Sequence, residues 1–164
     1  MSQTQADAVA LLPELVAQEA DLRFPRFDED VAWALGVRLT EAARAAGLPV
    51  VVSVRRNGQR LFHAALPGTS ADNDAWIDRK CRVVDRFSKS SYRVGTECRV
   101  RGQSFEEVFR LDADTYAAHG GAFPVNVVGV GVVGTVAVSG LPQADDHAFV
   151  VEQLRHYLTT VSEG

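Results

Sequence analysis

The amino-acid sequence predicts an α+β fold with three layers, in which an antiparallel sheet of about five strands has helices on both faces. Three observations favour this fold: a marked β-hairpin at Asn57-Gly58, long amphipathic helices at both ends of the chain, and short turns between the paired strand-like runs. Short turns join antiparallel neighbours, whereas parallel neighbours need a longer crossover. We expect residues 1–164 to form a single domain, since this length can bury a sizeable core.

The N-terminal part is expected to contain a helix over 6–22, a short edge strand over 22–27 and a second helix capped by Asp28. In the first helix Pro13 falls near the first turns, where a missing N–H costs least. Gly47 is a suitable stop for the second helix. The second helix has one apolar stripe, formed by Val31, Ala34, Leu35, Leu39, Ala42, Ala43 and Ala46.

The hairpin is predicted from two β-rich runs that flank Asn57-Gly58. A type I′ turn needs positive φ at both central residues, and Asn-Gly is the favoured pair. In the register that a two-residue loop sets, Val52 faces His63, so His63 is expected to be a core histidine. Both faces of the hairpin are largely apolar, which indicates a central hairpin with helices on either side.

The remaining predicted elements, in chain order, are a helix over 72–93, a short helix near 112–118, strands over 123–128 and 131–139, and a last helix capped by Asp145 or Asp146. The 72–93 helix has an apolar face and a basic stripe, formed by Arg79, Arg82, Arg86, Lys89 and Arg93. This stripe is either a solvated face, a contact with a neighbouring subunit, or an attraction for an anionic ligand.

Gly129-x-Gly131-x-x-Gly134 has the spacing of a dinucleotide-binding loop. Such a loop needs a helix that begins at the third glycine, so that its N-terminus meets the pyrophosphate. Here the next residues, 135–138, read as another strand. The glycines are therefore expected to form a turn or bulge between two strands.

Composition narrows the classes of partner. A net charge of −4 and a pI near 5.5 argue against nucleic acid. The uncharged stretch 120–144 is long enough to span a bilayer, but its glycines, prolines and valines favour strands, so no membrane segment is expected. Cys81 and Cys98 have no metal-binding spacing and no secretory leader precedes them, which predicts free thiols and a cytoplasmic location.

Two side chains, Lys80 and His119, are candidates for contacts with a ligand. Lys80 falls within the apolar arc of its helix, where it extends past its neighbours, pairs with a carboxylate, or faces the acid group of a ligand. His119 precedes Gly120-Gly121 in a predicted loop, where a histidine is accessible and glycines let a ligand approach the backbone. His147 is expected at the surface or at an interface. No histidine spacing indicates zinc, and no nucleophile motif is present, so no catalytic or metal-binding residue is assigned.

Four segments are informative in combination: WALG (33–36), LFHAALPGTSADNDAWIDRKCRVVDRFSKSSYRVG (61–95), HGGAFPV (119–125) and GVGVVGTVAVSGLPQADDH (129–147). Together they resemble the HbpS-like, or GlcG-like, haem-degrading-domain family, in its branch of small bacterial and fungal proteins. The resemblance implies a five-stranded antiparallel sheet flanked by helices and assembly into homo-oligomers. It also implies a shared ligand surface at the loop 119–124, beside the strand that ends in Ser139-Gly140, and some relatives bind haem or take part in its handling.

The leading hypothesis is a cytosolic, homo-oligomeric domain that binds a small acidic ligand, with haem or another tetrapyrrole as the best-matching cofactor. The candidate ligand-binding residues are Lys80, His119, Gly120, Gly121, Phe123 and Pro124. Lys80 or the basic stripe would contact carboxylates, His119 would make a polar or axial contact, and Phe123 would pack on the ligand. The alternative is a non-catalytic assembly or adaptor protein that binds protein partners through its oligomer surface. An enzyme is the third hypothesis.

Overall fold

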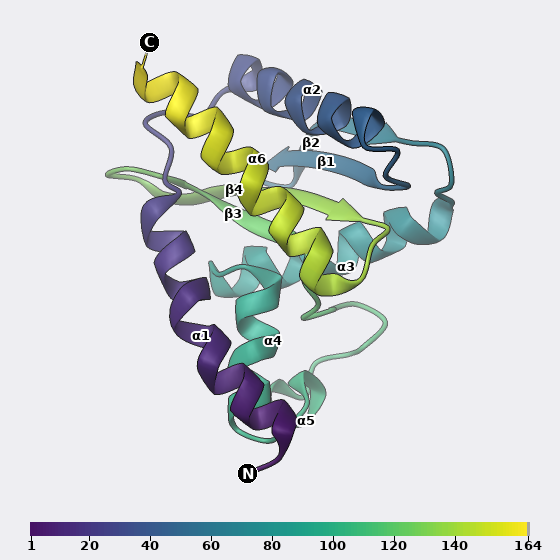
Figure 1. The fold of residues 1–164 in the computed structure, drawn as a ribbon, viewed down its shortest axis with the longest axis vertical. Coiled ribbons are helices and arrows are strands. Elements are labelled where there is room, and N and C mark those ends of the chain that lie inside the picture. The colour runs from purple at the N-terminus through teal and green to yellow at the C-terminus, as the bar shows by residue number, and fades with distance from the viewer. Residues whose placement is uncertain (164) are drawn as a thin grey trace.

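A computed structural model describes residues 1–163 and confirms the α+β class (Figure 1). Its four strands form one antiparallel sheet in the order β2-β1-β4-β3, one strand fewer than expected. The elements in chain order are α1 (Gln3–Asp21), α2 (Glu29–Ala45), β1 (Val51–Arg56), β2 (Gln59–Ala65), α3 (Ala71–Phe87), α4 (Ser91–Val100), α5 (Phe105–Phe109), β3 (Ala122–Val127), β4 (Gly131–Ser139) and α6 (Gln143–Glu163).

The expected edge strand over 22–27 is reduced to a single parallel bridge between Phe24 and Val127. The Phe24 N–H donates to Asn126 O at 2.7 Å, and its carbonyl accepts from Val128 N at 2.9 Å. Pro25 follows and has no N–H with which to extend the ladder. The segment therefore serves mainly to bury the Phe24 ring, which is fully inaccessible to solvent.

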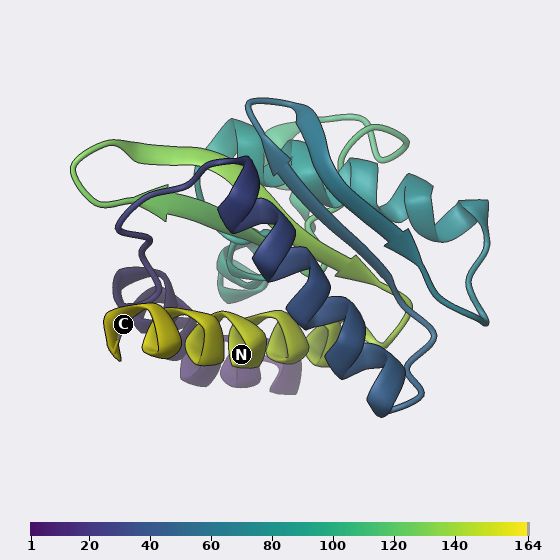
Figure 2. The same ribbon diagram turned by 90° about the horizontal axis from the view of Figure 1, so that it is seen from above.

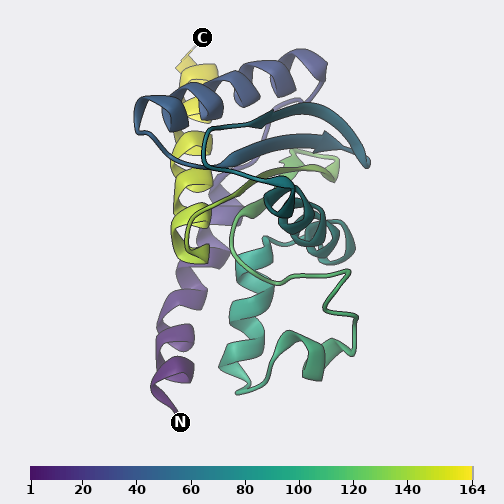
Figure 3. The same ribbon diagram turned by 90° about the vertical axis from the view of Figure 1, so that its right-hand side faces the viewer.

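Helices cover both faces of the sheet, with α2 and α6 on one face and α3 on the other (Figures 2 and 3). Alternate residues of β1 point to opposite faces, as the pleat requires. Val52 belongs to the larger core under α2 and α6, and Val51 packs with Ile77 and Cys81 of α3. All four side chains are buried, so the middle layer is packed on both sides.

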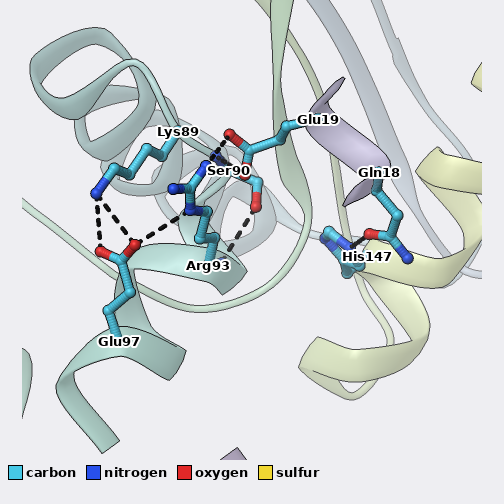
Figure 4. A network of polar contacts seen from close by, with 7 residues as sticks. All are labelled: Gln18, Glu19, Lys89, Ser90, Arg93, Glu97 and His147. Atoms are coloured by element: carbon cyan, nitrogen blue, oxygen red, sulfur yellow. Dashed lines mark hydrogen bonds and ion pairs between the residues drawn. The ribbon is translucent and has the colours of Figure 1, made fainter. Parts of the chain in front are cut away.

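Helices α1, α4 and α5 extend below the sheet in Figure 1, with α1 lying along α4. The polar contacts in Figure 4 tie α1 to the rest of the molecule. Glu19 pairs with Arg93 at the start of α4 at 3.1 Å, and Gln18 contacts His147 of α6 at 2.7 Å. Because α1 begins at Gln3, Pro13 lies in the helix interior rather than near its first turns.

The β1–β2 hairpin has the predicted turn, with φ of 49° at Asn57 and 83° at Gly58. Its register differs, because an irregularity between Val54 and Arg55 offsets the pairing. His63 therefore pairs with Ser53 rather than Val52 and lies on the opposite face from the one predicted. The interpretation of His63 as a core histidine is wrong. The hairpin was predicted to be central, but only β1 lies inside the sheet, whereas β2 forms one edge.

The helix predicted over 72–93 is two helices, α3 and α4. Ser88 adopts a left-handed conformation with φ of 55° and ends α3, and the Ser90 hydroxyl then accepts from Arg93 N as the N-cap of α4. The short helix expected near 112–118 is absent from the described chain. Residues from Asp112 form a turn, and α5 lies earlier in the chain.

The glycines at the β3–β4 connection form a turn, as predicted. Gly129 and Gly131 have φ of 78° and 111°, and Gly134 pairs with Val125 within the sheet. Among residues 1–163, no helix has the length and apolar character needed to cross a bilayer.

Candidate functional site

A cavity of about 250 Å³ opens where the start of α3, the end of β4, the start of α6 and the loop before β3 meet. It is lined by Asp72, Asn73, Trp76, Lys80, His119, Ser139, Gly140, Leu141, Gln143 and Asp146. Lys80 and His119, which the sequence analysis singled out separately, thus line the same cavity.

Lys80 is buried and paired with a carboxylate. Its Nζ donates to Asp146 Oδ2 at 3.1 Å and to the carbonyl oxygen of Val138 at 3.1 Å, and the residue is only 3% exposed. The other oxygen of Asp146 accepts from Leu141 N at 3.0 Å. Of the three arrangements considered for Lys80, pairing with a carboxylate is the one observed. Asp146 does not cap α6, because that helix begins at Gln143 and Asp146 points inward from its first turn.

Burial dominates the electrostatics of this pair. It lowers the pKa of Lys80, and the nearby Asp146 carboxylate partly restores it. It likewise raises the pKa of Asp146, against the attraction of Lys80. Each buried charge compensates the other. Removing one partner of such a pair leaves an uncompensated charge and lowers the free energy of unfolding by about 3–5 kcal/mol.

His119 lies exposed at the mouth of the cavity. Its ring centroid is 5.2 Å from that of Trp76, and the Arg79 guanidinium lies 4.0 Å from the centroid of the same Trp76 ring. Partial burial lowers the pKa of His119, and the Lys80 ammonium adds to the effect. The imidazole is therefore mainly neutral at pH 7, with a nitrogen lone pair free for a ligand.

The other predicted ligand-binding residues do not line the cavity. A Cβ on Gly120 would lie 2.2 Å from Gln143 O, and one on Gly121 would lie 2.7 Å from Lys80 Nζ. The two glycines thus let the chain pack against α6 and Lys80. Phe123 and Pro124 are buried in β3, and the Phe123 ring packs in the core 6.0 Å from the His147 ring.

Of the ten lining residues, only Lys80 and His119 were among the predicted ligand-binding residues, and Trp76 and Asp146 are the most important of those missed. Trp76 lies one helical turn before Lys80, and this i,i+4 spacing could have placed it beside the lysine. Asp146 is separated from Lys80 by most of the C-terminal half of the chain. No local pattern reports that pairing, because it depends on how α6 packs against the end of β4.

His147 is buried, so the prediction of a surface or interface residue is wrong. It is 4% exposed, and its Nε2 contacts Gln18 Oε1 at 2.7 Å. Burial lowers the pKa of His147 to about 4. The sequence misled because His147 directly follows two aspartates at a helix start, a pattern typical of solvent-exposed first turns.

The basic stripe is divided between two helices: Arg82 and Arg86 are exposed on α3, whereas Arg93 lies on α4. Arg82 donates to Thr115 O at 3.1 Å, and Arg86 lies 3.4 Å from the Tyr116 hydroxyl. Lys89 and Arg93 both bind Glu97 of α4 (Figure 4). Within residues 1–163, no three His, Cys, Asp or Glu side chains are grouped as metal ligands.

Comparison with known proteins identifies the family. Residues 27–155 match the family model for haem degrading protein HbpS-like. The chain belongs to the HbpS-like family. It is 60% identical to a UPF0303 protein of Streptomyces avermitilis over 156 residues, which covers 95% of this chain and 96% of that protein.

Two solved structures extend the likeness of this HbpS-like chain. The crystal structure of the Ybr137w protein matches with a TM-score of 0.84 and 30% identity, covering 91% of this chain and 88% of the other. The crystal structure of a PduOC–heme complex matches with a TM-score of 0.64 and 14% identity, covering 80% and 94% of the two chains. At that identity the second match shows a shared fold.

Proposed function

We propose that this HbpS-like protein binds haem or another tetrapyrrole at the mouth of the cavity, where His119 would hold the group. The carrying observation is the exposed, mainly neutral imidazole of His119 beside the Trp76 ring. A histidine of this kind is a common protein ligand of haem iron. The family description and the haem in the PduOC neighbour support the choice of ligand.

The cavity could hold the edge of a tetrapyrrole but not the whole ring. The cavity of about 250 Å³ is smaller than the roughly 300–1,000 Å³ of pockets that enclose drug-sized ligands. Part of the macrocycle would therefore lie over the surface around Trp76. Lys80 is already paired with Asp146, so Arg79 of the basic stripe replaces it as the partner for an acidic substituent.

Bound haem would supply a redox-active iron, and the chain would supply its placement. His119 would orient the group, Trp76 would cover part of one face and Arg79 would hold an acid group. A cytoplasmic location belongs to the same proposal, and the two buried free thiols, Cys81 and Cys98, support it.

The test is a titration of the protein with haemin, followed by the Soret band. We expect a shifted band on binding and, for His119→Ala, an affinity at least about tenfold lower, or about 1.4 kcal/mol. His156→Ala is the matched control, because His156 is exposed on α6 away from the cavity. Equal affinities of wild type and His119→Ala, or no Soret shift at all, would contradict the proposal.

A second candidate function, that of an assembly protein, is favoured by an exposed aromatic surface. Trp33 on α2 is 64% exposed, and its ring packs edge-on against Phe62 of β2 at 5.7 Å. This aromatic surface lies beside the free edge of the sheet and also contains Glu41 and Arg44. Opposite charges on one patch suit a two-fold interface, so a second copy of the chain is its proposed occupant.

Sedimentation velocity tests this assembly. We expect a homo-oligomer for the wild type and dissociation for Trp33→Ser, which removes the largest apolar contact. Val130→Ser is the control, because Val130 is 71% exposed in the β3–β4 turn, outside the aromatic surface. A wild type that sediments as a monomer, or a Trp33→Ser variant that assembles normally, would contradict the assignment.

A further inference from the structure

The chain is poor in lysine, with only Lys80 and Lys89 against fifteen arginines. The two lysines have contrasting surroundings. Lys89 is partly exposed and pairs with Glu97 at 3.0 Å. Lys80 is almost fully buried, yet it forms part of the cavity wall. A small molecule that enters the cavity would therefore meet the Lys80 side chain at its wall.

The geometry around Lys80 leaves one donor position of its ammonium group open. An ammonium has three N–H donors, and Lys80 uses two of them, toward Asp146 and Val138. Gly121 lets its backbone approach Nζ closely, because a Cβ there would come within 2.7 Å of it. A carboxylate oxygen that can accept the ammonium proton is 3.1 Å away. An amine, a proton acceptor and a cavity are thus in one place.

We propose that Lys80 captures small, uncharged aldehydes or ketones as an imine in this cavity. The proposal is independent of haem binding, which uses His119 at the mouth. Lysines that form imines are those whose surroundings release the proton easily. Burial lowers the pKa of Lys80 and raises that of Asp146, so both shifts favour the neutral amine that attacks a carbonyl.

The reaction needs no oxidant or reductant. The ammonium of Lys80 gives a proton to Asp146, and the free amine forms a C–N bond to the carbonyl carbon. The C=O electron pair moves to oxygen, which takes a proton from the positively charged nitrogen of the new C–N bond to give a carbinolamine. Asp146 then returns its proton to the hydroxyl oxygen, the C–O bond breaks, one water leaves, and the nitrogen lone pair forms the C=N bond of a protonated imine.

The surroundings also select the carbonyl compound. The lining contains the acids Asp72 and Asp146 against the single cation Lys80, while His119 is mainly neutral. An anionic aldehyde would meet net repulsion there. The half-buried Trp76 ring offers a flat apolar wall, and about 250 Å³ is room for a small molecule.

Imine formation would not leave Asp146 without a partner. A protonated imine keeps one positive charge and one N–H, so the ion pair with Asp146 at the site of the former ammonium persists. An uncompensated buried carboxylate is thereby avoided. This property separates imine formation from neutral modifications such as acylation, which would break the pair.

Reductive trapping tests the proposal. The folded protein, without haem, is incubated at pH 7 with benzaldehyde and cyanoborohydride, and the benzyl groups are located by peptide mass mapping. We expect benzylation of Lys80 at least about tenfold above that of Lys89, because only Lys80 lines the cavity and has a proton-accepting carboxylate buried beside it. Equal labelling of the two lysines, or labelling of Lys80 only after unfolding in urea, would overturn the proposal.

Two variants sharpen the result. Lys89→Arg removes the competing lysine and should leave the Lys80 signal unchanged. Lys80→Met abolishes it, and the double variant Lys80→Met/Asp146→Leu serves where the single change fails to fold. Wild-type mapping decides the matter even when neither variant folds. If haemin binds but Lys80 is not trapped, the imine proposal alone is contradicted. If Lys80 is trapped but haemin gives no Soret shift, the haem proposal alone is contradicted.

Discussion

His147 shows how much a single buried imidazole contributes to this fold. Its Nε2–H donates to the amide oxygen of Gln18 and so links α6 to α1. Its Nδ1 is buried and has no hydrogen-bond partner among the described residues. Protonation at Nδ1 would place a charge and an unpaired donor in the packed interior beside Phe123 and Tyr92.

The stability of the protein should therefore fall in mild acid. Burial lowers the pKa of His147 from 6.5 to about 4, so between these values the unfolded chain binds a proton that the folded chain does not. The contribution of the neutral, buried His147 to the free energy of unfolding is full above pH 6.5. It is lost as the pH falls toward 4, by about 3 kcal/mol in all. Urea unfolding between pH 4 and 7.5 measures this. His147→Gln should lose this part of the slope and exposed His156→Gln should keep it; identical slopes in all three proteins would refute the assignment.

For single residues, the sequence predicted the positions of some side chains of the site but not of others. Lys80 could be placed among apolar neighbours because a helix repeats every 3.6 residues. His119 could be placed in an accessible loop because glycines follow it. Asp146 could not be assigned to Lys80, and His63 was assigned to the wrong face. Both depend on contacts between distant segments, which no local pattern contains.

Among the elements, α4 is positioned by a close approach of two backbones. Gly95 of α4 lies against the chain just before His119, and a Cβ there would come within 2.1 Å of the Ala118 carbonyl oxygen. On α2, Gly36 has a similar role, but its Cβ would meet the Phe62 ring at 2.2 Å. A carbonyl oxygen of a fixed segment cannot move aside, whereas a ring on an edge strand can turn outward.

Gly95→Ala should consequently destabilise the protein by about 2 kcal/mol, despite the better helix propensity of alanine. Gly36→Ala is the matched comparison and should cost less than Gly95→Ala. Thermal and urea unfolding give both values. If Gly95→Ala proves neutral or stabilising, α4 is not held against the His119 loop in the way described.

The sequence specified most elements and failed where two local signals compete. The serines at 88 and 90 suit a helix cap as well as a helix surface, and the apolar periodicity on either side concealed the break between α3 and α4. Between the pairs Arg55–Arg60 and Val54–Phe62, β2 contains one additional residue. From Phe62 onward, each side chain of β2 therefore lies on the opposite face from the one predicted. Turn chemistry predicted the hairpin at Asn57-Gly58 because two positive φ values are a strong demand.

At the scale of the whole molecule, burial is uneven. The sheet is covered on both faces, and most residues of the strands β1 and β4 at its centre are buried. In α1, by contrast, three residues are buried: Ala8, Leu15 and Gln18. Pro13 removes one hydrogen bond from the middle of that helix. Glu19 is then the main polar tie of α1 to α4, through Arg93 and Ser90.

Native-state hydrogen exchange should accordingly divide the molecule into two levels of protection. Segments with few buried contacts open locally, so amides of α1 should exchange with a lower opening free energy than those of β4. Glu19→Gln should lower protection in α1 further, because it breaks the pair with Arg93 while Arg93 keeps Glu97, and β4 should be unaffected. Exchange of α1 and β4 at one common opening free energy would mean that α1 unfolds only with the sheet, and the tie through Glu19 would then be of minor importance.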